Sequence, residues 1–335
     1  MTRLVAARSG TSPLAVGLVA LALGLLAVFL TVYFRRGLIP GDALVYLAAG
    51  ERLNAGHPLY AISAGDRPIG IQPPHWTVPL LSPPFIAVMF RPLALLPPDS
   101  GAYLWWAAAL AAIGAVLIAY LRANPILASV AIMVLVVPLT YEIGVGNVNA
   151  FLLLGSVLVW RWTGERREPW AGALTAFLVM LKVSPVVLAW WLITQQRWTA
   201  VRTGVAVGLV LGVASLLGAG LEAHVRYLEI TRDTAAIGAS DLSLAGIARW
   251  LGVSPTLAQL LPTAMLIGGM AGVLLLRARP GLAFALAVAT MTLGSPVVNI
   301  NSYALLLGCL APAMWPKRVE TPGPAKAAMA VPARS

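Results

Sequence analysis

The chain has 335 residues, of which 59% are hydrophobic and 10% are charged, and its mean hydropathy is +0.86. A soluble domain is closer to half apolar and a quarter charged. This composition excludes a soluble enzyme, a disordered chain and a DNA-binding domain, and it predicts an all-α polytopic membrane protein. The net charge of +11 fits that class, because basic residues anchor cytoplasmic loops. It does not indicate a nucleic-acid partner.

Cysteine and histidine are scarce. The one cysteine, Cys309, lies in an apolar run, so neither an intrachain disulfide nor a zinc cluster is expected. The three histidines, His57, His75 and His224, leave little room for a transition-metal site. We therefore expect no metal site and no cofactor, and a divalent cation is not indicated.

Apolar runs follow one another along most of the chain. The first, 14–33, is too long for a signal-peptide core and lacks a cleavage site, so it predicts a retained helix. Further runs lie at about 79–97, 101–121, 125–143, 147–162, 170–195, 201–220, 256–276, 281–297 and 299–315. They predict about 8 to 11 membrane segments within one integral membrane domain, 14–315. Residues 1–13 form a short N-terminus, and 316–335 have the composition of a disordered tail.

Orientation follows from arginine and lysine in short loops, which mark cytoplasmic ends. With both termini inside, 34–78 becomes the first outer loop and 221–254 the second outer region, which includes a short surface helix at 241–251. The markers then agree only if 79–97 and 170–195 are re-entrant hairpins, and Pro83–Pro84 and Pro185 supply the breaks. The alternative is that both segments cross fully, which places 161–167 outside. The basic markers are Arg122, Arg161, Arg166, Arg167, Arg197, Arg202, Arg277, Arg279, Lys317 and Arg318.

The first outer loop contains an acid at the start of a predicted helix. Pro40–Gly41–Asp42 precedes a helix over 43–54 that Gly56 ends. Helical spacing places Asp42 and Tyr46 on roughly one face. Asp42 is either a helix N-cap or a group that performs acid–base chemistry, and spacing alone leaves both open.

A lysine interrupts the apolar run 173–194. Lys182 is one of three lysines, and the other two lie near the C-terminus. Burying an ammonium at bilayer depth costs a few kcal/mol unless a carboxylate, a phosphate or a water-filled cavity meets it. Lys182 therefore faces a ligand, or it forms a structural ion pair, for example with Glu142.

Three other polar stretches interrupt the apolar runs. The segment 142–149 has two glycines and two asparagine amides, and is either a ligand-facing loop or a simple turn. The stretch 72–76 is polar and aromatic, as expected at a membrane interface. The stretch 295–303 has four polar side chains, which should face a cavity or partner helices because unsatisfied polar groups are costly in lipid.

The order of these pieces resembles glycosyltransferase family 87, whose members have the GT-C architecture and use polyprenyl-phosphate sugars. The matching stretches are DALVYLAAGERLNAGHPLY (42–60), SPPFIAVMFRPLALLP (82–97), GNVNAFLLL (146–154), AGALTAFLVMLKVSPVVLAWWLITQQRW (171–198) and SLAGIARW (243–250). The resemblance covers about 40–310. It implies an enzyme of the bacterial plasma membrane with its active site on the non-cytoplasmic side.

The resemblance also implies roles for individual residues. Asp42 matches the aspartate that serves the family as catalytic base, and Lys182 matches a lysine of the active-site cavity. The reaction is transfer of a mannose- or arabinofuranose-like sugar, with inversion, from a polyprenyl-phosphate donor to a lipid or glycan acceptor. Further candidates for the donor phosphate are Arg67, His57 and His75. Candidates for the sugar or acceptor are Tyr46, Tyr60, Gln72, Asn147, Asn149, Asn299 and Asn301.

The chain departs from the family pattern at several positions. Asn147 stands where the family often has Gln, Asn299 where it has Trp, and Asn301 where it has His. Asp241 and Leu242 replace an Asn-Gln pair. Loss of that histidine favours a second hypothesis, a catalytically inactive relative that acts as a membrane subunit or lipid-binding scaffold. Retention of the aspartate and lysine favours the enzyme.

Overall fold

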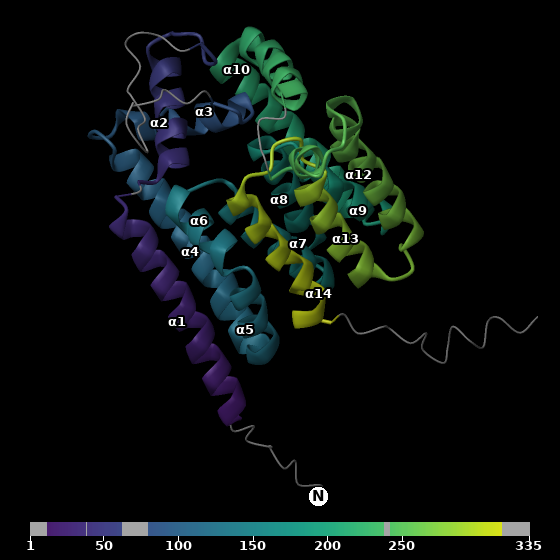
Figure 1. Cartoon of the computed structure of the whole chain (residues 1–335). Coiled ribbons are helices and arrows are strands. Elements are labelled where there is room, and N and C mark those ends of the chain that lie inside the picture. The colour runs from purple at the N-terminus through teal and green to yellow at the C-terminus, as the bar shows by residue number, and fades with distance from the viewer. Residues whose placement is uncertain (1–11, 38, 62–79, 238–241, 317–335) are drawn as a thin grey trace, which may run out of the picture.

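The computed structural model describes residues 12–37, 39–61, 80–237 and 242–316. Within these ranges the chain forms helices joined by short connections, without a strand. Figure 1 shows α1 (Pro13–Arg35), α4 (Ser100–Ala123) and α5 (Pro125–Val134) side by side, with the later helices packed beyond them. The predicted all-α polytopic bundle is confirmed.

Four of the described helices are long and apolar enough to cross a membrane: α1, α4, α10 (Trp198–Ile237) through residue 232, and α12 (Pro255–Leu275). A fifth span results if α5 and α6 (Val136–Val145), which are bent by 75° relative to each other, are counted together. These helices expose many large apolar side chains, as on α1 and α10. Such surfaces fit a lipid environment, where exposed leucine and valine carry no penalty.

The segment 170–195 forms a hairpin of two short helices, α8 (Glu168–Leu181) and α9 (Val186–Thr194). Its two ends meet, because Arg197 Nη1 lies 2.8 Å from Glu168 Oε1 across the start of α10. A segment whose ends are paired leaves at the end where it entered. The segment is therefore a hairpin of two helices, as predicted. That it is re-entrant in a membrane, rather than crossing fully, stays a prediction.

The helices within residues 80–97 are also short. Helix α3 (Pro84–Phe90) has 7 residues and is followed by the 3₁₀-helix η1 (Leu93–Leu95). Seven residues extend about 10 Å, against roughly 30 Å for a hydrocarbon core. Arg91 Nε donates to Asn54 Oδ1 at 3.0 Å, which ties this segment to the end of α2 (Gly41–Asn54).

Helix α10 bends at Gly220, where φ is +80° and ψ is 160°. A positive φ favours glycine because it has no Cβ. Beyond the bend, the helix packs Ala223 and Tyr227 against the apolar residues of α2 and α3. The bend lies where the sequence predicted the transition from a span to the second outer region. The predicted surface helix there is α11 (Leu244–Trp250), with the Ser243 hydroxyl as its N-cap.

Two apolar clusters hold the bundle together. The larger one surrounds Trp160 of α7 (Asn149–Gly164), Trp191 of α9 and Phe284 of α13 (Pro280–Leu293). It also includes the last elements, the 3₁₀-helix η2 (Ile300–Leu310) and α14 (Ala311–Met314). The smaller one joins α2 and α3 to α4 through Tyr46 and Trp105. The cavity described below takes its walls from both clusters.

The arginine-bearing loops gather at one end of the bundle. The Arg161 guanidinium lies 5.2 Å from the ring centre of Trp315, beside α14. Gln195 Nε2 donates to the carbonyl oxygen of Arg277 at 3.2 Å. In Figure 1, α14 lies at the opposite end of the bundle from α2 and α3. We call the loops at 161–168, 195–197 and 277–280, with Trp315, the basic end.

Candidate active site

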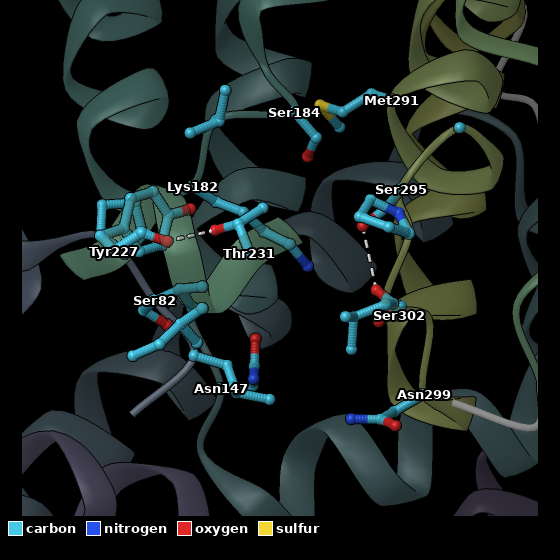
Figure 2. A pocket seen from close by; sticks show the side chains of 18 of the residues that line it. Ser82, Asn147, Lys182, Ser184, Tyr227, Thr231, Met291, Ser295, Asn299 and Ser302 are labelled. Atoms are coloured by element: carbon cyan, nitrogen blue, oxygen red, sulfur yellow. Dashed lines mark hydrogen bonds between the residues drawn. The ribbon is translucent and has the colours of Figure 1, made fainter. Parts of the chain in front are cut away.

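A cavity of about 440 Å³ opens between elements that are far apart in the chain. Its walls come from the start of α2, the loop before α3, the α6–α7 turn, the α8–α9 break, the second half of α10 and the connection from α13 to η2. Figure 2 shows Lys182 and Ser184 on one side, Ser295, Asn299 and Ser302 across from them, and Asn147 and Ser82 below. Among the described residues that line it, Asp42 and Lys182 are the two that carry charge.

Asp42 lies in the first turn of α2, which begins at Gly41 with Pro40 as its N-cap. Asp42 follows the N-cap by two positions, and among the described residues no side chain caps this helix, so the interpretation of Asp42 as N-cap is wrong. Its Oδ2 instead accepts a hydrogen bond of 2.6 Å from Asn147 Nδ2. Burial raises the pKa of the Asp42 carboxyl above its usual value, while the bond from Asn147 and the positive charge of Lys182 lower it.

The turn between α6 and α7 presents two asparagines to the cavity and its wall. Gly146 ends α6 with a φ of +67°, and Trp105 Nε1 donates to its carbonyl oxygen at 3.0 Å. The Asn147 side-chain oxygen accepts from the Asn149 backbone N–H at 3.0 Å. That bond fixes which end of the Asn147 amide points at Asp42, because an amide has one accepting and one donating end. The segment is therefore a turn whose side chains also belong to the site.

Lys182 lies at the break between α8 and α9, in an extended backbone conformation. Its side chain extends into the cavity (Figure 2), and Nζ donates to Asn149 Oδ1 at 3.1 Å. The alternative in which Lys182 forms a direct ion pair with Glu142 is wrong. Asn149 lies between the two groups, because its Nδ2 donates to Glu142 Oε2 at 3.3 Å.

Glu142 was not among the residues predicted for the site. Its side chain is 1% exposed near the end of α6. Oε1 accepts from the Ala150 backbone N–H at 2.8 Å, and Oε2 accepts from Asn301 Nδ2 at 2.9 Å as well as from Asn149. An acid in an apolar helix was a signal that it has buried polar partners.

The other predicted site residues divide into three groups. Tyr46 and Asn299 line the cavity. Asn149 and Asn301 lie behind its wall at Glu142, His57 is exposed at the end of α2, and none of these three lines the cavity. Tyr60 also lies outside it, with its hydroxyl donating to the Ser82 carbonyl at 2.8 Å and its ring on Tyr227. Arg67, Gln72 and His75 lie outside the described residues.

Several hydroxyl groups of the cavity were missed. The Ser184 Oγ and Thr290 Oγ1 atoms are buried and have no hydrogen-bond partner among the described residues, although both residues line the cavity. Ser184 follows Lys182 by two positions and precedes Pro185, so the polar sequence at the helix break was the available signal. Tyr227 and Thr231 come from the bent part of α10, and no local pattern indicated that they face this cavity.

An apolar groove of about 230 Å³ lies between α8, α9 and α10. Val186 lines both the groove and the cavity, so the two adjoin near Lys182. Thr175 is the one polar side chain among the described residues that line the groove, and its hydroxyl donates to the Ala171 carbonyl at 2.8 Å. The groove is therefore suited to a hydrocarbon chain.

Comparison with known proteins identifies the family. Residues 81–325 match the model of glycosyltransferase family 87. The chain belongs to this family. It is 28% identical over 227 residues to the polyprenol-phosphate-mannose-dependent alpha-(1-2)-phosphatidylinositol pentamannoside mannosyltransferase of Mycolicibacterium smegmatis, covering 63% of this chain and 52% of that one.

A protein with the same description from Mycobacterium tuberculosis is 28% identical over 207 residues, which is 59% of this chain and 46% of the relative. The chain thus spans about half the length of the curated relatives that it matches. No solved structure matches it. Among the described residues, no group of three or more His, Cys, Asp and Glu lies close enough to bind a metal ion.

Proposed function

We propose that this family 87 member transfers a mannosyl group from a polyprenyl-phosphate donor to a hydroxyl of a lipid-linked or glycan acceptor, with inversion. The observation that carries the proposal is that Asp42 and Lys182 line one cavity, from opposite parts of the chain. A carboxylate and an ammonium are the two charged groups that this displacement requires. The relatives' printed names supply the donor and a lipid-linked acceptor as precedents.

In the proposed reaction, the acceptor hydroxyl attacks the anomeric carbon of the sugar. A new carbon–oxygen bond forms while the bond to the phosphate oxygen breaks, and its electron pair leaves with the polyprenyl phosphate. The hydroxyl proton passes to the Asp42 carboxylate, which acts as general base. One base on one face and one leaving group on the other invert the anomeric centre.

Lys182 is the proposed partner of the donor phosphate. The leaving group gains negative charge in the transition state, and a fixed cation in a dry cavity stabilises that charge. One of its three N–H donors is held by Asn149, which leaves the others to face the cavity. Asn147, Asn299 and the free hydroxyls of Ser184 and Thr290 are candidates for sugar or acceptor hydroxyl groups.

The adjoining groove supports a lipid donor over a soluble one. Its apolar lining meets the cavity at Val186, a short distance along the chain from Lys182. A phosphate at Lys182 could therefore continue into a chain that follows α8 and α10 into the bilayer. A nucleotide sugar would bring a polar group to this apolar surface, where it would remain unsatisfied.

The experiment is transfer of labelled mannose by the purified full chain in lipid vesicles. Polyprenyl-phosphate mannose, polyprenyl-phosphate arabinofuranose and a nucleotide-linked mannose are compared as donors, with membrane lipid extract as acceptor source. Mannolipid formation from the first donor alone supports the proposal, and the anomeric configuration of the product tests inversion. Lack of transfer from every donor, with the chain folded and binding polyprenyl phosphate, favours the scaffold hypothesis.

The proposed orientation places the cavity on the non-cytoplasmic side and the basic end inside the cell. On a Cys309→Ala background, His57→Cys and Arg166→Cys provide thiols at exposed positions near opposite ends. A membrane-impermeant thiol reagent applied to intact cells should label only position 57. Labelling of position 166 alone overturns the proposed orientation.

A further inference from the structure

Glu142 is a buried carboxylate surrounded by donors. The Ala150 backbone N–H and the side-chain NH₂ groups of Asn149 and Asn301 all point at its two oxygens, at 2.8 to 3.3 Å. A protonated carboxyl would direct its own O–H at one of these donors. The arrangement is therefore satisfied only by the ionised, acceptor-only form. A buried negative charge of this kind requires a nearby positive charge.

That positive charge is Lys182, and the Asn149 amide connects the two. Nδ2 of Asn149 donates to Glu142, so its Oδ1 points the other way and accepts from Lys182 Nζ. An amide cannot present two acceptors, so its orientation toward Glu142 decides what it offers to Lys182. With Asn149 reversed, an NH₂ group would face the ammonium, and two donors would oppose each other.

We propose that Glu142 is a positioning residue that sets donor affinity. Through Asn149 it holds the Lys182 ammonium at the cavity wall and supplies its resting counter-charge. This inference rests on the proposed function, because it assigns the donor phosphate to Lys182. Asn301 belongs to the same arrangement: it stands where the family pattern has histidine, and it acts on the cavity through Glu142.

Glu142→Gln tests this inference because the glutamine amide has one accepting and one donating end, and its orientation forces that of Asn149. The Ala150 N–H still requires an acceptor, so the glutamine oxygen must face it and the new NH₂ group must face Asn149. Asn149 then reverses and presents its NH₂ group to Lys182. We expect the Kd for polyprenyl phosphate and the KM for the donor to rise about tenfold or more, the effect of losing a charge-assisted contact. We expect kcat to change less.

The double variant Glu142→Gln/Asn149→Asp should restore binding. The carboxylate then lies at position 149, where one oxygen accepts from the glutamine introduced at position 142 and the other accepts from Lys182. The number of charges is that of the wild type, and Lys182 again donates to an oxygen at position 149, now that of a carboxylate. We expect Kd and KM within about threefold of wild type, since an acceptor again faces Lys182 and its counter-charge is kept.

Thr140→Val is the matched control on the same helix. Thr140 is buried, and its hydroxyl donates to the Val136 carbonyl rather than to the Glu142 cluster. The substitution is nearly isosteric, so it perturbs α6 packing but not the orientation of Asn149. Its Kd and KM should equal those of wild type.

Binding of polyprenyl phosphate, measured by titration in detergent, separates this inference from the proposed function. Weakened binding in Glu142→Gln that the double variant restores supports the inference, whether or not transfer occurs. Unchanged binding in Glu142→Gln overturns it, as does a folded double variant that binds no better than the single one. Should Glu142→Gln fail to fold, the double variant alone decides by its Kd. Wild type that binds polyprenyl phosphate without transfer contradicts the proposed function alone.

Discussion

The cavity and the basic end place the same kinds of charged group in opposite surroundings. At the cavity, Asp42 and Lys182 both line one space, and each is held by an asparagine amide. At the basic end, Arg197 pairs with Glu168 while its side chain is 39% exposed and that of Glu168 is 22% exposed. Arg161 and Glu165 pair within one helix end with both side chains 40% exposed.

The two regions differ in whether water is able to replace a lost partner of a charged group. A surface ion pair that is broken is solvated at once, so its loss costs little. A buried group whose partner is removed stays without one, at a cost of about 1–3 kcal/mol or more. Charges at the cavity should therefore control binding and catalysis, whereas those at the basic end should control orientation in the membrane.

Asp42→Asn should have the largest effect of any single substitution. Asparagine is nearly isosteric and its oxygen is able to accept the bond from Asn147, so fold and donor binding should persist. Turnover should fall by roughly 10²–10⁴-fold, the usual contribution of a general base. The measurement is kcat for mannolipid formation together with the Kd for polyprenyl phosphate.

Glu51→Gln is the control for Asp42→Asn, because Glu51 lies on the same helix and outside the cavity lining. It should leave kcat within about twofold of wild type, because it keeps the size of a half-buried side chain and removes a charge outside the cavity. An Asp42→Asn variant that transfers sugar as fast as wild type would remove Asp42 from the mechanism.

Gly208→Leu should separate long donors from short ones. A Cβ at Gly208 meets the Ala176 Cβ at 3.8 Å, so a leucine there enters the apolar groove. Displacing about two methylene groups of a bound chain costs about 1.6 kcal/mol, or roughly tenfold in kcat/KM. Donors with one or two isoprene units, too short to fill the groove, should be used as by wild type.

Gly212→Leu is the matched control for Gly208→Leu, because Gly212 lies one turn further along α10. A Cβ at Gly212 meets nothing within 4 Å, and Gly212 does not line the groove. This variant should retain the wild-type preference for long donors. Equal behaviour of the two variants across donor lengths would show that the chain binds elsewhere.

Asn147→Ala should move the acid limb of the pH–rate profile. The bond from Asn147 lowers the pKa of Asp42, which burial has raised, so its loss raises that pKa further. A general base is active only when deprotonated, and activity is lost as pH falls through its pKa. The acid limb of kcat should therefore lie at higher pH in the variant, with a smaller change on the plateau.

Asn299→Ala provides the comparison, since Asn299 lines the cavity across from Asn147. This variant changes sugar or acceptor contacts without touching Asp42, so KM should respond while the acid limb stays in place. An unmoved limb in Asn147→Ala would mean that another group limits the rate at low pH.

The sequence predicts the helical segments of this fold better than it predicts the contacts between them. Apolar runs and proline breaks indicate the hairpin at 170–195, because a buried lysine followed three residues later by a proline favours a break in the helix. That Asp42 and Lys182 share a cavity follows only from the resemblance. No periodicity relates residues on α2 to a break more than a hundred positions later.

The direction of buried amides could not be predicted. Asn149 and Asn301 were expected to contact sugar or acceptor, yet both point at Glu142 behind the wall. The reason is that Asn301 lies in a 3₁₀-helix after the irregular residues 294–299, so which face it presents depends on that connection. An amide then takes the orientation that satisfies its partners, and those partners lie on other elements.

Arg197→Ala should have the smallest effect, although it removes the ion pair between the two ends of the α8–α9 hairpin. Both groups reach water, so their separation costs about 0–1 kcal/mol, and the melting temperature should fall by at most a few degrees. Activity should stay within about twofold of wild type because the pair lies at the end of the bundle away from the cavity. The informative quantity is the contrast in donor binding with Glu142→Gln, since each variant removes one of two opposite charges, in one case at the surface and in the other in the interior. A large loss of donor binding in Arg197→Ala would mean that the hairpin ends transmit their position to Lys182, fourteen residues from Glu168 along α8. The cavity and the basic end would then be one coupled unit rather than two independent regions.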